Sequence, residues 1–320
     1  MSWTTVNDQR NPPGDAQITY GITSAGGTFN LRSTGTVDYE VEWGDGTVER
    51  STSNTLAHTY AAGNYVLKIR TSQQYVPYFN NSTDGGQITS VALVSDLGVG
   101  TELRLAWFGA NNMTSFNAAF GVTTGVTNFT YTWRGCSSLT SFPLIDTSSA
   151  TDFFVAWDSC SSLTSFPLLD TTNLADVRYA WRGCSSLTSF PLIDTSSLPS
   201  FQSTWENCSS LTSFPLIDTS SGTSFNGAWR FCNSLASFPA NMFDTTGTLI
   251  AGAFDNAFTN CALTAQSVEN ILVSLDTNGA TGITLSISGG TTVGQSSWTA
   301  AATTAYNNLI AKGWTITANP

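Results

Sequence analysis

The sequence contains little charge and almost no lysine or histidine. Only 10% of its 320 residues are charged, against about 25% in a typical soluble domain. Lys68 and Lys312 are the only lysines, and His58 is the only histidine. Nucleic-acid binding depends on clustered Lys and Arg, and most metal sites and acid–base relays depend on His. We therefore expect no nucleic-acid partner and no cofactor.

The chain also lacks recognisable targeting segments. Residues 1–10 show no basic stretch followed by an apolar one, so we expect no secretory signal and synthesis in a cytoplasm without an export address. No apolar run approaches the roughly 18 residues that a membrane helix needs, so we expect no membrane insertion. A hydroxyl-rich surface that is poor in lysine nevertheless suits an extracellular or particle-borne protein.

What the sequence does contain is a repeat with a period of 24 residues. The string C-S-S-L-T-S-F-P-L begins at Cys136, Cys160, Cys184 and Cys208, and a looser copy begins at Cys232. A tryptophan lies three residues before each of these cysteines, and a Phe or Val lies four residues before each tryptophan. Degenerate copies flank the array, which gives about seven coils with atypical ends, as stacked repeats require. The tryptophans are Trp133, Trp157, Trp181, Trp205 and Trp229.

The spacing within each repeat predicts a short helix and a short strand. Phe201, Trp205 and Cys208 fall at i, i+4 and i+7, on one face of a helix. The segment that begins at Leu139 reads L-x-x-F-x-L, the spacing of an inward-facing strand in a leucine-rich repeat. A proline falls inside each such strand and cannot donate to a β-ladder. We therefore expect a very short ladder with one bond missing per coil.

These repeats resemble a known family. The pattern F-x-x-x-W-x-x-C-x-x-L-T-S-F-P-x-x-D-T-S is similar to the BspA-type leucine-rich repeats of bacterial surface lipoproteins, protist surface proteins and phage proteins, and it covers residues 103–263. The resemblance implies an adhesion or recognition surface and transfers no catalytic residues.

The segment before the repeats resembles a second family. The similarity to PKD-type domains lies in three motifs: W-G-D-G-T (residues 43–47), H-T-Y (58–60) and A-G-N-Y-V-L-K-I (62–69). Apolar and polar residues alternate over 39–43 and 65–69, as they do in strands. The resemblance implies an immunoglobulin-like β-sandwich that serves as a spacer or interaction module.

Together these observations predict an α+β protein with five segments. We expect an N-terminal arm (1–15), a PKD-like β-sandwich (16–72), a transition segment (73–100), a BspA-like leucine-rich-repeat solenoid (101–263) and a C-terminal α/β cap (264–320). In the cap, periodicity predicts helices over 267–275 and 298–311 and strands over 283–287 and 314–317.

Each column of identical residues has a structural and a functional interpretation. Cysteines at one position per coil, with Ala110 at the equivalent position of a flanking copy, indicate reduced core thiols rather than disulfides or zinc ligands. For the tryptophans we expect the core, with a glycan-stacking platform as the alternative. For the aspartates we expect turn capping, with calcium binding between coils as the alternative. These aspartates are Asp146, Asp170, Asp194, Asp218 and, after an insertion, Asp244; Asp45 has the same two interpretations.

Two surfaces are candidates for partner binding. Outward residues of the expected strands would form an uncharged, regular face that binds through many equal contacts. This face comprises Ser141, Pro143, Ile145, Ser165, Pro167, Leu169, Ser189, Pro191, Ile193, Ser213, Pro215 and Ile217. The second surface is the residue after each tryptophan, which varies between coils; ordinary solvated turns are the alternative interpretation. Its residues are Arg134, Asp158, Arg182, Glu206 and Arg230.

No catalytic arrangement is recognisable, so we expect a non-enzymatic recognition or structural protein. The chain fits a bacteriophage virion component, such as a tail fibre, spike or head-decoration protein, located in the virion. Its expected partners are a host-surface protein or glycan, other virion proteins and, as a further candidate, a second copy of the chain. The alternative is a BspA-like adhesin on the bacterial cell surface.

Overall fold

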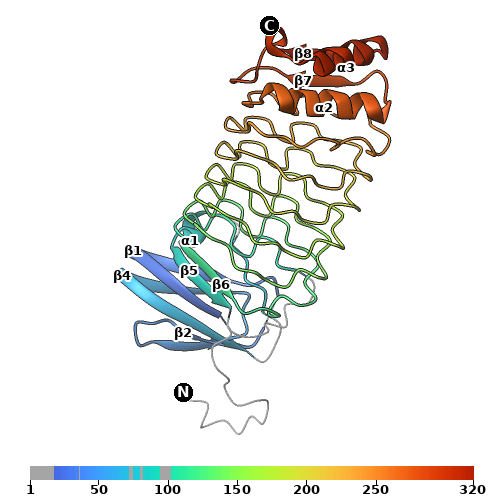
Figure 1. Cartoon of the computed structure of the whole chain (residues 1–320). Coiled ribbons are helices and arrows are strands. Elements are labelled where there is room, and N and C mark those ends of the chain that lie inside the picture. The colour runs from blue at the N-terminus through green and yellow to red at the C-terminus, as the bar shows by residue number, and fades with distance from the viewer. Residues whose placement is uncertain (1–17, 36, 72–74, 80–81, 94–101) are drawn as a thin grey trace.

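The computed structural model of the chain describes residues 18–35, 37–71, 75–79, 82–93 and 102–320. A β-sheet at the N-terminal end is followed by a stack of irregular coils, and two helices with a small sheet close the C-terminal end (Figure 1). The expected N-terminal arm lies outside the described residues, as do parts of the expected transition segment.

Six strands at the N-terminal end form one mixed sheet, in the order β3-β2-β4-β1-β5-β6. Neighbouring strands are antiparallel except β5 and β6, which run parallel. One face of the sheet carries the core, so alternate residues of β1, such as Ile18, Tyr20 and Ile22, are buried. The strands are β1 (Ile18–Arg32), β2 (Tyr39–Glu42), β3 (Val48–Ser51), β4 (Thr55–Thr71), β5 (Ile88–Leu93) and β6 (Ser115–Ala118).

The same sheet joins the N-terminal end to the coils. β6 belongs to the flanking repeat copy around Trp107, and it pairs with β5. Two further backbone bonds cross this junction, from Thr114 N to the Thr89 carbonyl at 2.9 Å and from Phe79 N to the Leu105 carbonyl at 3.2 Å. A one-turn helix, α1 (Ser82–Gly85), lies beside the junction, and a Cβ at Gly85 would lie 2.9 Å from the Phe108 carbonyl oxygen. The sheet therefore packs directly on the first coil.

The W-G-D-G-T segment forms a tight turn between β2 and β3. Asp45 Oδ1 accepts hydrogen bonds from Thr47 N at 2.9 Å and from Thr47 Oγ1 at 2.6 Å, and its Oδ2 lies 2.7 Å from His58 Nε2. The bonds from Thr47 are the main reason that the pKa of Asp45 falls to about 2. The His58 ring stacks on Trp43 with centroids 4.5 Å apart. This geometry favours turn capping for Asp45.

Backbone hydrogen bonds in the coils alternate between two kinds of acceptor. The N–H groups of Phe153, Val155 and Trp157 donate to carbonyls of the next coil, at 2.9, 3.1 and 2.8 Å. The intervening N–H groups of Ala156 and Asp158 donate to carbonyls three residues back in their own coil, at 3.0 and 3.4 Å. In this segment, alternate N–H groups therefore join neighbouring coils, and most of the groups between them close tight turns.

This alternation corrects the expected fold class. An α-helix requires bonds four residues back, and the positive φ of 60° at Val155 interrupts any helix. The expected helix is a series of turns, and described coils join through isolated bridges, such as Asp152 with Asp176 and Ser213 with Ser237, rather than a strand ladder. The predicted α+β class, with a two-sheet sandwich and a leucine-rich-repeat solenoid of strands and helices, is wrong. The described chain has mostly strands, few helices and a single mixed sheet at its N-terminal end.

Columns of aromatic side chains fill the interior of the coils. Trp157 and Trp181 stack with ring centroids 5.6 Å apart and planes at 3°. Phe166 meets both rings edge-on, at 4.9 and 5.2 Å. Both tryptophans are fully buried, and their indole N–H groups have no hydrogen-bond partner within the described chain. The tryptophans therefore belong to the core and contribute by packing.

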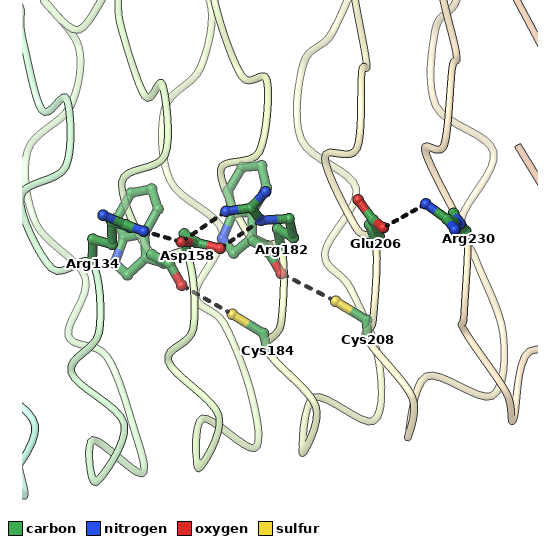
Figure 2. A network of polar contacts seen from close by, with 9 residues as sticks. Arg134, Asp158, Arg182, Cys184, Glu206, Cys208 and Arg230 are labelled. Carbon is green, nitrogen blue, oxygen red and sulfur yellow. Dashed lines mark hydrogen bonds and ion pairs between the residues drawn. The ribbon is translucent and has the colours of Figure 1, made fainter. Parts of the chain in front are cut away.

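The cysteine thiols form a second column beside the tryptophans. Cys184 Sγ donates to the Trp157 carbonyl of the preceding coil at 3.4 Å, and Cys208 Sγ donates to the Trp181 carbonyl at 3.2 Å (Figure 2). All six cysteines are buried free thiols. Burial raises the pKa of Cys208 to about 12, because a thiolate would be desolvated there. The thiols thus act as small core groups with a weak hydrogen bond.

We predict that none of the six thiols reacts with Ellman's reagent in the native protein at pH 8, and that all six react in denaturant. The raised pKa values also predict pH dependence. Cysteines of the unfolded chain ionise above about pH 8.5, whereas the buried thiols of the folded chain stay protonated. The free energy of unfolding is therefore unaffected by these thiols below about pH 8.5 and decreases as the pH rises toward 12. Rapid labelling of any thiol in the native state contradicts this prediction.

The C-terminal elements cover the last coil. α2 (Ala265–Asn278) begins at the N-cap Thr264 and ends at Gly279, which has a φ of 80°. Side chains of α2 bond the coil beneath it, including Ser267 to the Ala236 carbonyl at 2.7 Å and Asn270 to the Phe238 carbonyl at 2.8 Å. Beyond it lie η2 (Gln295–Ser297), α3 (Ala300–Ala311) and the parallel pair β7 (Thr284–Ile287) and β8 (Thr315–Ala318). Among the described helices, none has the length and apolar character to cross a membrane.

Candidate partner-binding surfaces

The structure alters the predicted strand face. Its serines are exposed and its prolines half-buried, but the third residue of each set points into the core. Ile145, Leu169, Ile193 and Ile217 are only 1–3% exposed, so the prediction that they face outward is wrong. The segment around each proline forms no regular strand, so the side chains do not alternate as the prediction required.

A row of leucines takes their place on the surface. We call Leu144, Leu168, Leu192 and Leu216 the leucine row; they are 51–61% exposed and occupy one position per coil. Beside them, exposed hydroxyls repeat in the same register, and Thr164 Oγ1 donates to the Thr140 carbonyl at 3.2 Å. This face is uncharged and regular, and it differs little from coil to coil.

The residues after the tryptophans form a second row with a different chemistry. We call Arg134, Asp158, Arg182, Glu206 and Arg230 the charged row (Figure 2). Asp158 lies between two arginines: Arg134 Nε donates to it at 2.9 Å, and Arg182 donates through Nε at 2.8 Å and Nη2 at 3.2 Å. The Asp158 side chain is 2% exposed, whereas the two arginine side chains are 39% and 34% exposed. Two guanidinium groups thus share one buried carboxylate, and the trio keeps one excess positive charge.

Aromatic rings lie next to these arginines. The Arg182 guanidinium stands 5.0 Å from the Tyr179 ring centroid, and the Arg134 guanidinium stands 5.7 Å from that of Tyr131. The Phe154 ring meets both tyrosines edge-on, at 5.6 and 5.9 Å. Cation–π contacts and the shared Asp158 therefore hold the arginines in place.

These side chains line an open surface hollow of about 230 Å³, which we call the slot. The hollow arises from a difference between coils at the residue two before the tryptophan, which is Tyr131, Val155 and Tyr179 in three successive coils. The Phe154 ring lies between the two tyrosines, and the small valine next to it leaves a shallow hollow. The slot is lined by Tyr131, Arg134, Phe154, Val155, Tyr179 and Arg182.

Positive φ recurs two residues before each tryptophan of the coils, both at the slot and away from it. Tyr131, Val155 and Tyr179 have positive φ values of 59°, 60° and 61°, whereas Gly227 occupies the equivalent place in a later coil. This conformation costs a non-glycine residue roughly 1–2 kcal/mol, and it is a marked outlier for a β-branched valine. Leu105 and Ser203 adopt the same conformation at the equivalent position of other coils, so the backbone of the coil requires it.

The aspartate column closes turns. Asp194 Oδ1 accepts from Ser196 N at 2.9 Å and from Ser196 Oγ at 2.7 Å, and these bonds lower its pKa. Asp146 bonds Ser148 in the same way. Among the described residues, no group of three or more His, Cys, Asp or Glu could hold a metal ion. The geometry favours turn capping over calcium binding.

Comparisons with known proteins give no match. No protein-family model, curated protein or solved structure matches the chain. The resemblance to BspA-type repeats and PKD-type domains therefore rests on the quoted motifs and stays a prediction.

Sequence reasoning identified the charged row but missed its aromatic neighbours. Tyr131 and Tyr179 lie two residues before a tryptophan, and Phe154 and Arg178 lie three before one. Their signal was present in the repeat alignment, because these positions vary where most of the repeat is constant. Assigning the segment to a helix concealed that they share one surface.

The left-handed positions allow a reciprocal test of backbone strain. Ser159, exposed with a φ of 65°, occupies the place of Gly135 and Gly183 in adjacent coils. We expect Ser159→Gly to stabilise the protein by about 0.5–1 kcal/mol, the relief of strain less the extra chain entropy of glycine. Gly135→Ser, where a Cβ meets nothing closer than 3.7 Å, should destabilise it by a similar amount. Thermal unfolding measures both, and equal melting temperatures for the two variants contradict the assignment.

Proposed function

We propose that this chain is a non-enzymatic recognition protein whose charged row and slot contact a partner. The observation that carries the proposal is the display of varied Arg, Tyr and Phe side chains at positions repeated through the stack, some of them in strained left-handed backbone. Arg and Tyr are enriched among residues that dominate binding energy. A rigid scaffold holds such groups more accurately than mobile loops do.

The leucine row is less suited than the charged row to distinguish one partner from another. Its residues are identical in successive coils and carry no charge or hydrogen-bonding group. The charged row instead alternates partly exposed arginines with acidic residues, as in Arg134, Asp158 and Arg182. Discrimination between partners needs directional and charged contacts as well as area, and the charged row supplies them.

For the biological setting, we propose a bacteriophage virion component that binds a host-surface molecule or another virion protein. The buried, unpaired thiols suit assembly in a reducing cytoplasm. The motifs for BspA-type repeats, which also occur in phage proteins, support the same setting.

Cell binding tests the recognition role. We expect fluorescently labelled protein to bind intact cells of at least one strain in a bacterial panel, measured by flow cytometry. Combining Tyr131→Ala with Tyr179→Ala should weaken that binding by at least about tenfold, because two ring contacts are lost. A matched control, Leu168→Ser with Leu192→Ser, should bind as the parent does. Binding to no strain, or loss only in the leucine control, contradicts the proposal.

Particle composition tests the setting. Mass spectrometry of purified phage particles from a strain that encodes this chain should detect it as a stoichiometric component. Its detection in the cell envelope fraction and not in the particles would refute the virion proposal and support a cell-surface adhesin.

A further inference from the structure

The leucine row runs beside carboxylates at the surface. In each coil of the row the leucine is exposed, the next residue is buried and the aspartate after it lies at the surface again, as Leu192, Ile193 and Asp194 show. The leucine and aspartate side chains therefore project from the same side of the coil. The members of the aspartate column that lie beside the leucine row are Asp146, Asp170, Asp194 and Asp218.

No cation balances these carboxylates within the described part of the chain. Hydrogen bonds, chiefly from Thr124 to Asp146 and from Ser196 to Asp194, lower the pKa of both carboxyls and keep them charged at neutral pH. The ion pairs among the described residues include none of the four aspartates. Like charges in successive coils repel one another, so basic side chains of a partner would stabilise this surface.

The leucines themselves form a contiguous apolar stripe. Single exposed apolar residues are common on proteins, whereas a contiguous row that is rimmed by polar groups is typical of an interaction site. The phenylalanines two residues before the leucines stack with ring centroids 5.7, 6.4 and 6.1 Å apart, so the leucines recur at a comparable spacing. The surface is therefore apolar along one line and acidic along the line beside it.

The direction of the row determines the backbone of a partner that follows it. The row crosses the coils from one to the next, so it presents side chains and no strand edge to which an extended peptide could bond. An α-helix needs no such edge, because it satisfies its own backbone. Its pitch of about 5.4 Å is close to the spacing of the phenylalanines behind the leucines. One helical turn therefore corresponds to about one coil.

We propose that the leucine row and the neighbouring aspartates bind a basic amphipathic α-helix of another protein. This inference goes beyond the recognition function proposed above, because none of these residues belongs to the charged row or the slot. Apolar side chains of the helix, one per turn, pack against the leucines, and Lys or Arg side chains on one flank pair with the carboxylates. A second copy of the chain is a poorer occupant, because the same face brings further carboxylates and no cation.

Designed peptides test the chemistry of the occupant. The probe is a fluorescent peptide of about 20 residues, a helix roughly 30 Å long, with leucine at every third or fourth position and lysine directly after each leucine. One counterpart carries glutamate in place of lysine, and another carries glutamine in place of leucine. By fluorescence polarisation, we expect the basic amphipathic peptide to bind the parent protein at least about tenfold more tightly than either counterpart.

Variants of the protein locate the binding surface. Leu168→Ser with Leu192→Ser should weaken binding of the basic amphipathic peptide by at least about tenfold, because two apolar contacts are lost. Asp170→Asn with Asp194→Asn keeps an oxygen that can close each turn but removes both charges. It should weaken binding by about three- to tenfold and reduce the dependence of binding on salt.

A matched control, Val66→Ser with Ile310→Ser, removes two exposed apolar side chains elsewhere and should bind the peptide as the parent does. Melting temperatures establish that the variants are folded. Equal binding of the basic and acidic peptides, or full binding by the leucine or the aspartate variant, overturns the proposal. A dimer in sedimentation velocity that the leucine variant abolishes also overturns it, because the occupant is then a second copy. Cell binding through the charged row and slot is measured separately and does not depend on this result.

Discussion

The structure depends on backbone hydrogen bonding between coils. Around each tryptophan, alternate N–H groups donate to the next coil, and most of the groups between them close turns within the coil, as Val155 and Ala156 illustrate. Neither regular helix nor regular ladder forms, yet the backbone polar groups of successive coils find partners, as buried groups must. The aromatic columns follow from this register, because equal backbone positions bring equal side chains into contact. Trp157 stacks on Trp181 at 3° between planes for this reason.

The same register determines which side chains pack in the interior and which ones lie at the surface. Side chains that alternate inward, such as Phe153 and Trp157, are fixed by the columns, while Phe154 and Asp158 are free to differ from their neighbours. Composition gave a misleading impression of this surface. The net charge of −11 suggests an acidic protein, but five of its 11 basic residues are arginines of the coils. They are Arg104, Arg134, Arg178, Arg182 and Arg230, placed one after or three before a tryptophan. Four of these arginines pair with carboxylates of the coils, namely Arg134 and Arg182 with Asp158, Arg178 with Asp176 and Arg230 with Glu206.

The repeat period, the buried cysteines and tryptophans, and the C-terminal helices could be predicted from the sequence. α2 and α3 have apolar periodicity and threonine caps, which act locally. The conformation inside a coil could not, because the i, i+4, i+7 spacing of Phe201, Trp205 and Cys208 suits a helix and a stacked turn equally. The choice between them depends on whether N–H groups donate to carbonyls of the next coil, which lies 24 residues away in the sequence. The error at Ile145 has the same origin, since proline-containing segments held by stacking need not alternate as strands do. The slot depends on a difference between neighbouring coils, which a consensus of the repeat averages away.

The positive-φ residues have a consequence for how such a surface changes over time. Each coil bonds its neighbours through the same backbone positions, so duplication or deletion of 24 residues would lengthen or shorten the array without redesigning its interior. Point substitutions at the residue two before the tryptophan would then open or close individual hollows, as valine does beside Phe154. The order of the coils in the stack therefore determines the shape of the binding surface. A chain of this kind can follow a changing target by rearranging existing units.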